Sequence, residues 1–287
     1  MAERVCIITG ASSGIGRAAA CELARGGLAL GLVCRSPSRG EDAVAAIRSA
    51  TGNDDVELFV ADLAVQDEIR RVAAEILERY PAIHVLLNNA GVMHMRRTET
   101  PDGIESTFAV NHLAYFLLTQ LLLDRLRASA PARIVNVASD AHRFGQLDLD
   151  DLEYRRRRFR PMQVYGSSKL LNILWTYELA RRLEGSGVTA NCLHPGGVNT
   201  GLGDQNAGPL YLLGKLVKIF MRTPERGAET SVYLCRSPEV EGVSGRYFAD
   251  CRERRSSPIA HDRDAARRLW EQSERLTGVS PPAGRGR

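Results

Sequence analysis

The chain has 287 residues, of which 44% are hydrophobic and 25% are charged, as in ordinary soluble globular proteins. Such a chain can bury a large core, and its net charge of +4 does not by itself indicate a nucleic-acid partner. Its six scattered cysteines lack Cys-x-x-Cys spacing, and we find no signal peptide and no apolar run near the length that spans a bilayer. We therefore expect a cytoplasmic protein with reduced thiols.

Short apolar runs alternate with longer helical patterns almost from end to end. In chain order we expect strand 5–9, helix 14–25, strand 28–34, helix 41–49, strand 56–60, helix 65–79, strand 83–87, helix 108–128, strand 133–138, helix 164–183, strand 188–193, helix 225–235, strand 245–249 and helix 263–274. Near-continuous apolar strands separated by helices predict an α/β fold. We expect a single doubly wound Rossmann-type domain over residues 1–278, with a parallel sheet of about seven strands and helices on both faces. Residues 279–287 are predicted to be a disordered tail.

The first expected strand is followed directly by Thr9-Gly-Ala-Ser-Ser-Gly-Ile-Gly16, which opens the first helix. Glycines let such a turn tighten and let the backbone approach a pyrophosphate, whose charge the helix N-terminus favours. The strand-turn-helix context therefore predicts a dinucleotide site. The residues expected to contact the cofactor here are Gly10, Ser12, Ser13, Gly14, Ile15 and Gly16.

The end of the second strand indicates which dinucleotide is bound. Many NAD-binding folds place an acid there for the ribose hydroxyls, whereas this chain has no acid before Glu41. Arg35 is placed to pair with a 2′-phosphate through its planar fork, Arg39 can assist, and Ser36 can donate a hydrogen bond. These residues favour NADP(H) over NAD(H), and a solvated arginine on a loop is the alternative.

Two weaker signals follow the third and fourth strands. Asp62 and Leu63 form a pair that can hydrogen-bond an adenine edge. Asn89, Ala90 and Gly91 bring small residues to a place where the backbone can pass close to the cofactor. Each signal alone is also compatible with ordinary turn chemistry.

Tyr165 and Lys169 are four residues apart in an expected helix, so they lie on one face, one turn from each other. A free tyrosine has a pKa of about 10, and a nearby cation lowers that pKa by favouring the phenolate. A tyrosine held in this way can give a proton to a carbonyl oxygen or take one from an alcohol.

With these pieces in order, almost the whole chain resembles a short-chain dehydrogenase/reductase. The resemblance implies a catalytic tetrad of Asn111, Ser139, Tyr165 and Lys169. It also implies that Tyr165 and Lys169 contact the cofactor, together with Pro195, Gly196, Val198 and Thr200 after the sixth strand. Within the family, the chain is most similar to the retinol dehydrogenase-like branch, on the segments Asn111-His-Leu-Ala-Tyr-Phe-Leu-Leu-Thr119, Val137-Ala-Ser-Asp-Ala-His142, Leu193-His-Pro-Gly-Gly197 and Gly245-Arg-Tyr-Phe248.

The resemblance implies an oxidoreductase that interconverts a carbonyl compound and its alcohol. Tyr165 would exchange the proton and Ser139 would orient the substrate oxygen. Lys169 would lower the pKa of Tyr165 and bind the nicotinamide ribose, and Asn111 would position Lys169 through a water. The family also implies a homo-oligomer, a dimer or tetramer, through helices 108–128 and 164–183.

Two further segments bear on the substrate. Residues 210–221 are apolar with two lysines and lie within 200–224, a region that covers the substrate in this fold. If they form a lid, the substrate is lipophilic, such as a retinoid, a long-chain aldehyde, a steroid or an aromatic ketone; a plain core helix is the alternative. The basic run 154–160 is best interpreted as a solvated loop, with weak contact to anionic lipid headgroups as a second interpretation and nucleic-acid binding as a third.

The leading functional prediction is an NADP(H)-dependent reductase for lipophilic aldehydes or ketones. The first alternative is an NAD-dependent alcohol or steroid dehydrogenase. The second, from another class, is a non-catalytic NADP(H)-binding redox sensor, against which the complete tetrad argues. No cluster of His, Cys and Asp has metal spacing, so we predict no metal.

Overall fold

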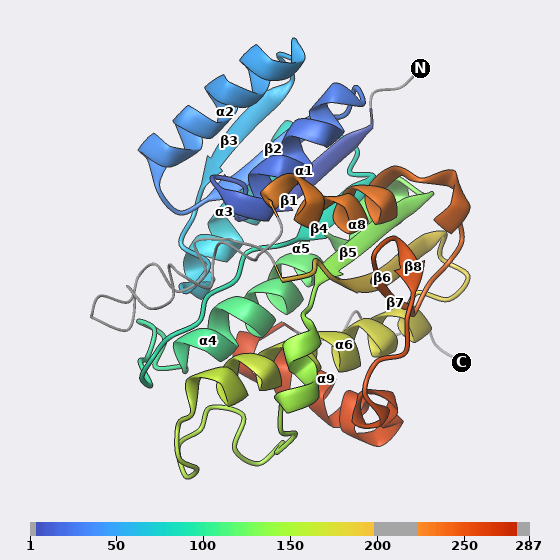
Figure 1. Ribbon diagram of the computed structural model, residues 1–287. Helices are drawn as coiled ribbons and strands as arrows, with labels where there is room; N and C mark the ends of the chain where they lie inside the picture. The colour runs from blue at the N-terminus through green and yellow to red at the C-terminus, as the bar shows by residue number, and fades with distance from the viewer. Residues whose placement is uncertain (1–3, 198–222, 280–287) are drawn as a thin grey trace.

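A computed structural model describes residues 4–197 and 223–279, and an eight-stranded sheet forms its centre (Figure 1). The strand order is β3-β2-β1-β4-β5-β6-β7-β8, and every pair is parallel except the last. The strands are β1 (Val5–Thr9), β2 (Ala29–Cys34), β3 (Val56–Val60), β4 (Val85–Asn88), β5 (Ala132–Val137), β6 (Val188–His194), β7 (Tyr247–Ala249) and β8 (Arg252–Glu253). The predicted doubly wound parallel sheet is confirmed, and the antiparallel β8 was missed because two charged residues carry no strand pattern.

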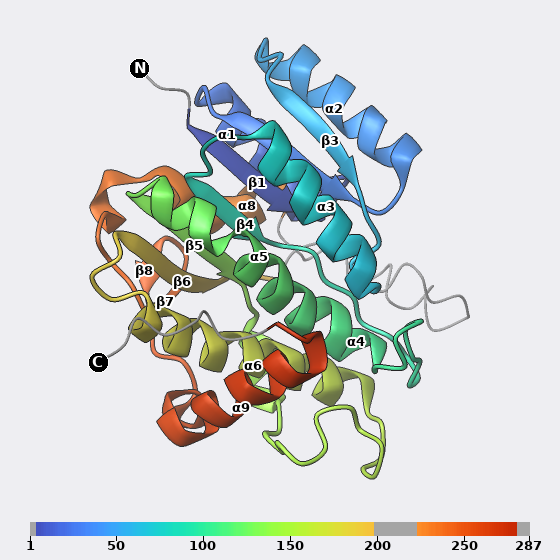
Figure 2. The ribbon, with the colours of Figure 1, turned by 180° about the vertical axis from the view of Figure 1, so that it is seen from behind.

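Helices cover both faces of the sheet, as Figures 1 and 2 show from opposite sides. The helices are α1 (Gly14–Arg25), α2 (Pro37–Thr51), α3 (Gln66–Arg79), α4 (Ser106–Phe108), α5 (Ala114–Ala128), α6 (Pro161–Arg182), α8 (Pro224–Arg236) and α9 (Arg263–Thr277). One apolar core joins the sheet to α1, α2 and α8, and a larger core joins it to α3, α5, α6 and α9. Because both faces are buried, β1, β2 and β5 consist entirely of buried residues, and no apolar-polar alternation marks them.

Helices α2 and α6 begin four and three residues earlier than predicted. Helix α2 starts at Pro37, where the Ser36 side chain accepts a hydrogen bond from the backbone N–H of Arg39. Helix α6 starts at Pro161. Proline at the first helical position already has the φ angle of a helix. It also has no N–H group, and an N–H group at that position would have no partner within the helix. These two prolines were the available signal, and apolar periodicity alone placed both starts too late.

The predicted helix 108–128 is interrupted by the π-helix η1 (Ala109–Leu113), which contains Asn111. The combined helical segment Ser106–Ala128 has the length and, with a mean hydropathy of 1.2, the composition that a membrane span requires. This differs from the expectation that no apolar run approaches that length. However, 89% of its apolar window is buried inside the domain, as in a core helix. A π-bulge re-aims the side chains of one turn, and such bulges are frequent at functional sites.

The C-terminal helix α9 packs against the outer side of α5 and α6 (Figure 2). The ring of Trp270 meets Phe116 of α5 edge-on, with 5.1 Å between centroids, and the guanidinium of Arg182 of α6 lies 4.2 Å from its ring. An aromatic pair with this geometry adds about 0.5–1.5 kcal/mol beyond the burial of its area. The α5 and α6 face through which the sequence predicts association is thus partly covered by the chain itself, and a homo-oligomer stays a prediction.

Candidate active site

The glycine turn after β1 has the conformation that dinucleotide binding requires. Gly10 and Gly14 adopt positive φ angles of 69° and 57°, which side chains disfavour. At Gly16, an added Cβ would lie 2.4 Å from both the Gly10 carbonyl oxygen and Asn89 Nδ2, so only glycine fits this start of α1. The turn is therefore held close to the sheet, with its backbone facing outward.

The N-terminus of α1 is open to an anion. The side chain of Ser13, the capping residue, makes no hydrogen bond to the helix, and the first turn contains no acidic residue. The first backbone N–H groups of a helix lack internal partners and carry the positive end of its dipole. The predicted contacts Ser12, Ser13, Gly14 and Ile15 surround these groups and are all at least partly exposed. This arrangement fits the pyrophosphate of a dinucleotide.

Thr9 and Asn89 clamp the turn to the end of β4. Thr9 Oγ1 accepts hydrogen bonds from the backbone N–H groups of Asn89 and Ala90, at 2.9 and 3.0 Å. Asn89 Nδ2 donates to the carbonyl oxygens of Thr9 and Gly10, at 2.9 and 3.2 Å. The side chain of Asn89 is thereby committed to the turn, and any cofactor contact of Asn89–Gly91 falls to their backbone. Sequence reasoning missed Thr9, although a threonine ending a strand before a glycine turn was available as a signal.

Arg35 follows the last residue of β2 and is exposed. Within the described part of the chain neither Arg35 nor Arg39 forms an ion pair, so both guanidinium groups remain available to an anion. Burial, and secondly the charge of Arg35, lower the pKa of His94, which places Arg35 near the segment that follows β4. No acidic residue occupies the position where a ribose-binding carboxylate is expected.

The side chains of Asp62 and Leu63 are engaged in the turn after β3. Asp62 Oδ1 accepts the backbone N–H of Ala64 at 2.9 Å, and its own N–H donates to Glu68. Leu63 is only 8% exposed and packs in the larger core. These contacts hold the turn in place but do not show whether it hydrogen-bonds an adenine, so adenine binding stays a prediction.

Asn111 is completely buried in η1 and makes a closed set of hydrogen bonds. Its Oδ1 accepts the backbone N–H of Val92 at 2.8 Å, and its Nδ2 donates to the Val92 carbonyl oxygen at 3.0 Å and to Ser168 Oγ at 2.9 Å. Ser168 Oγ in turn donates to the carbonyl oxygen of Tyr165 at 2.7 Å. Asn111 therefore ties the segment after β4 to the turn of α6 that carries the tyrosine.

Ser139 and Tyr165 are brought together at the carboxyl end of β5. Ser139 caps the short 3₁₀ helix η2 (Asp140–Phe144) by accepting the N–H of Ala141 at 3.2 Å. Burial raises the pKa of Tyr165 to about 12, and a hydrogen bond with the Ser139 side chain opposes part of that rise. The phenol of Tyr165 is thus protonated at neutral pH, and it contacts the hydroxyl of Ser139, its expected partner in the tetrad.

Lys169 lies beside two tyrosine rings. Its Nζ is 5.7 Å from the ring centroid of Tyr165 and 5.5 Å from that of Tyr115, and it donates to the Val137 carbonyl oxygen at 2.9 Å. Burial lowers the pKa of Lys169 to about 7. The lowering of the Tyr165 pKa that we predicted is not found in the protein alone, where burial of the phenol raises that pKa.

Two glycines fix the distance between η2 and α6. A Cβ at Gly145 would lie 2.6 Å from the Gly166 carbonyl oxygen, and a Cβ at Gly166 would lie 2.4 Å from the Ala141 carbonyl oxygen. The backbones therefore touch immediately beside Ser139 and Tyr165. His142 of η2 is buried, and its two ring nitrogens bond the Ser139 carbonyl oxygen and the Ser257 N–H at 2.7 and 3.0 Å. It is therefore a packed residue.

A buried chain of hydrogen bonds connects the tetrad to α9. Asn172 Nδ2 donates to the Asn111 carbonyl oxygen at 2.8 Å, so its Oδ1 faces His112 Nδ1, 3.3 Å away. His112 Nε2 lies 3.0 Å from the hydroxyl oxygen of Ser273, and that hydroxyl donates to the Leu269 carbonyl oxygen at 2.8 Å. Burial lowers the pKa of His112 to about 4, so the imidazole is neutral. Sequence reasoning missed all three residues, because their partners are distant in the chain.

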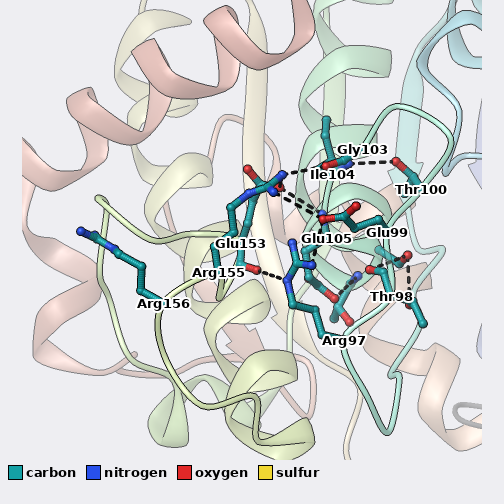
Figure 3. A network of polar contacts seen from close by, with 12 residues as sticks. Arg97, Thr98, Glu99, Thr100, Gly103, Ile104, Glu105, Glu153, Arg155 and Arg156 are labelled. Atoms are coloured by element: carbon teal, nitrogen blue, oxygen red, sulfur yellow. Dashed lines mark hydrogen bonds and ion pairs between the residues drawn. The ribbon is translucent and has the colours of Figure 1, made fainter.

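The basic run 154–160 is a folded loop whose charges are partly neutralised. Asp151 accepts the backbone N–H groups of Arg155, Arg156 and Arg157. Arg155 Nη2 donates to Glu153 at 2.9 Å and to the carbonyl oxygen of Gly103 at 2.8 Å. Figure 3 shows Arg155 directed at these two partners, while Arg156 points away from the network. The loop is therefore held in place beside the segment before η1, and lipid contact through it stays a prediction.

Several predicted residues lie outside the described part of the chain. These are Val198, Thr200, the apolar segment 210–221 and nearly all of the expected lid 200–224. Pro195 and Gly196, which are described, follow β6 at the same edge of the sheet as the other candidates, and Gly196 has a φ of 87°. Among the described residues no group of three or more His, Cys, Asp or Glu side chains could hold a metal ion.

Comparisons with known proteins agree with this geometry. The short chain dehydrogenase family matches residues 4–208. The chain is 44% identical to human retinol dehydrogenase 13 over 97% of its length and 86% of the relative, and 46% identical to mouse retinol dehydrogenase 14 over 97% and 87%. A solved protein of Mycobacterium paratuberculosis superposes with a TM-score of 0.79, at 33% identity, over 98% of this chain and 96% of the other.

A second solved structure, the NADP active-site complex of Pseudomonas aeruginosa RhlG, superposes with a TM-score of 0.69 at 25% identity, over 86% of this chain and 94% of the other. The glycine turn, the tetrad and the family match therefore point to one conclusion. The chain belongs to the short-chain dehydrogenase/reductase family and is an oxidoreductase of its retinol dehydrogenase-like branch.

Proposed function

We propose that this protein interconverts a lipophilic aldehyde or ketone and its alcohol with NADP(H), and that reduction is the net direction in the cytoplasm. The observation that carries the reaction type is the meeting of Ser139, Tyr165 and Lys169 at the carboxyl ends of the central strands, with Asn111 bonded to the same turn of α6. These residues come from three elements that are far apart in the sequence.

The chemistry follows from what each side chain holds. NADPH, when bound, supplies the hydride for the carbonyl carbon. Tyr165, protonated because burial raises its pKa to about 12, donates its proton to the carbonyl oxygen as negative charge develops there. Ser139 donates a hydrogen bond to the same oxygen and orients it. Lys169 in its charged form stabilises the phenolate that remains, and in the oxidative direction that phenolate accepts the proton of the alcohol.

The preference for NADP(H) is supported by Arg35. Its guanidinium is exposed at the end of β2 and lacks an ion-pair partner among the described residues. An acidic residue at this position would bind the ribose hydroxyls of NAD and repel the 2′-phosphate of NADP. A guanidinium fork matches the geometry of a phosphate, and such charge-assisted pairs are about twice as strong as neutral ones. Arg39 adds a second positive charge in the first turn of α2.

A lipophilic substrate is supported by exposed apolar side chains beside the tetrad. Phe144 is 69% exposed at the end of η2, the helix capped by Ser139. Met162 is 55% exposed and lies one turn before Tyr165 on α6. Large apolar side chains left in water next to a reactive group favour an apolar partner.

The first experiment compares NADPH oxidation with all-trans-retinal and with a short aldehyde, and uses Tyr165→Phe as control. Faster turnover of retinal, lost in the variant, supports both the tetrad and the apolar substrate. Activity on small carbonyls alone keeps the mechanism and discards the lipophilic substrate. Binding of NADPH without any Tyr165-dependent activity on a carbonyl panel would instead favour a non-catalytic redox sensor.

The cofactor preference has its own test in Arg35→Asp. Its matched control is Arg158→Asp, an exposed arginine on the loop beside α6. The ratio of kcat/KM with NADPH to that with NADH should fall roughly tenfold or more in Arg35→Asp only, because the new carboxylate repels the 2′-phosphate. An unchanged ratio would favour the NAD-dependent alcohol or steroid dehydrogenase.

A further inference from the structure

A groove of about 960 Å³ lies at the edge of the sheet opposite the candidate active site. Its floor includes Ala132 and Val188, the first residues of β5 and β6, whereas the candidate catalytic residues follow the other ends of these strands. Its walls come from the C-terminal ends of α6 and α8 and from the start of α9. The groove is therefore separate from the site that binds the dinucleotide.

The lining of this groove is strongly basic. The groove is lined by two acidic residues, Glu184 and Glu241. It is lined by six arginines: Arg4, Arg133, Arg181, Arg236, Arg246 and Arg263. The resulting excess of four positive charges is as large as the net charge of +4 of the entire chain. The groove is therefore a concave surface with a clear excess of positive charge.

Most of these arginines lack a carboxylate partner. Arg181 pairs with Glu178 at 2.6 Å, and Arg246 pairs with Glu253 at 3.5 Å. The other four, Arg4, Arg133, Arg236 and Arg263, form no ion pair with any described residue.

Arg133 is the most informative member, because it is 9% exposed and still forms no ion pair with a described carboxylate. Its Nη1 donates to the carbonyl oxygens of Leu234 and Ser237, at 3.1 and 2.9 Å. Burial, and secondly the charge of Arg4, lower its pKa, although Glu241 and Cys235 oppose that change. A buried guanidinium without an anion is costly, and an anionic ligand in the groove would offset that cost.

We propose that this groove binds a phosphate-bearing ligand with at least two negative charges. Guanidinium forks recognise phosphate oxygens in pairs, and the groove has a volume in the range of small-ligand pockets. The same chemistry is offered by a free polyphosphate and by the headgroup of an anionic phospholipid. The proposal does not depend on the reaction at Tyr165.

Isothermal titration calorimetry with inorganic tripolyphosphate tests the proposal, in the presence of saturating NADPH so that the cofactor site is filled. Arg4→Gln/Arg236→Gln removes two unpaired charges of the groove, and Arg158→Gln/Arg160→Gln removes two exposed charges from the loop beside α6. We expect binding that weakens with salt, and at least a tenfold loss of affinity in the groove variant only. No binding, or equal losses in both variants, would overturn the proposal.

A second arm separates the two sources of phosphate. The protein is sedimented with phosphatidylcholine vesicles that contain or lack phosphatidic acid, with and without competing tripolyphosphate. Groove-dependent binding to the acidic vesicles identifies a headgroup, and tripolyphosphate binding without vesicle binding identifies a free phosphate ligand. Vesicle binding that is retained in Arg4→Gln/Arg236→Gln and lost in Arg158→Gln/Arg160→Gln would assign the membrane contact to the loop and count against the groove.

Discussion

The imidazole Nε2 of His112 and the hydroxyl oxygen of Ser273 lie 3.0 Å apart, although 161 residues separate them in the chain. The first residue belongs to the π-helix that carries Asn111, and the second belongs to the C-terminal helix. Both side chains are completely buried. The C-terminal helix is thus connected to the tetrad by hydrogen bonds as well as by apolar packing, and its removal would leave His112 without one of its two partners.

We predict that Ser273→Ala lowers kcat several-fold at saturating NADPH, because His112 loses one of its two partners and Asn111 loses its fixed position. An unsatisfied buried polar group costs about 1–3 kcal/mol, so some stability is lost as well. Ser256→Ala is the matched control: Ser256 is also buried and bonds a histidine, His261, at 3.0 Å, but it has no link to Asn111. Equal kcat values in the two variants would show that the contact only stabilises the fold, and Ser273→Thr should restore the rate.

His112 gives the fold a measurable pH dependence. Burial lowers its pKa to about 4, whereas the unfolded chain has a histidine pKa of about 6.5. As the pH falls from about 6.5 towards 4, His112 is protonated in the unfolded chain but not in the folded protein, so the free energy of unfolding decreases. The loss is about 2 kcal/mol by pH 5. Urea unfolding between pH 7 and pH 5 should therefore show a smaller decrease for His112→Gln than for the wild type or for the exposed-site control His261→Gln; parallel curves would contradict this account.

Lys169 is predicted to reduce stability while it serves the reaction. Its pKa falls to about 7 in the folded protein, so between pH 7 and about 10.5 the unfolded chain holds more protons and stability rises with pH. Lys169→Met should be inactive, yet more stable at pH 7 without cofactor by about 1–4 kcal/mol. Its unfolding free energy should also vary less with pH over that range. Tyr165→Phe, which is also expected to be inactive, should retain the wild-type slope, and a less stable Lys169→Met would refute the prediction.

Gly16→Ala should weaken the binding of NADPH at least tenfold. The new Cβ would lie 2.4 Å from the Gly10 carbonyl oxygen, so the turn must move away from α1. Thermal unfolding with and without NADPH measures the effect, because a ligand at free concentration c that binds only the folded state stabilises it by RT ln(1 + c/Kd), so a weaker binder raises the unfolding temperature less. A variant that unfolds near the wild-type temperature alone, but gains little from NADPH, is the expected result. An undiminished gain would mean that the turn tolerates the side chain.

The sequence was sufficient to predict the fold, because the fold depends on local patterns, whereas the candidate tetrad came from the family resemblance and its roles stay predictions. Buried parallel strands are continuous apolar runs, and the tyrosine and lysine are one helical turn apart. Helix starts at Pro37 and Pro161 were placed late, since capping decides them and periodicity does not. The interruption at Asn111 was also missed, because a π-bulge has no fixed sequence pattern.

Contacts between distant segments were the part that the sequence could not provide. The partners of His112 come from α6 and α9, and nothing in the residues near it indicates either. The pKa of Tyr165 was predicted to fall because the spacing to Lys169 was visible, whereas the depth of burial that raises it was not. The arginines of the basic groove likewise come from positions between 4 and 263, so no run of charged residues in the sequence indicates the groove.

The contact between Gly145 and Gly166 has a consequence for how enzymes of this kind can change. Since neither position accepts a side chain, the second residue of the Tyr-x-x-x-Lys motif is not free to vary here, and mutational libraries that randomise it should return mainly glycine. New substrate preferences must instead come from side chains that do not separate η2 from α6, such as Phe144 and Met162. The reacting groups keep a constant spacing while the surface around them can be redesigned.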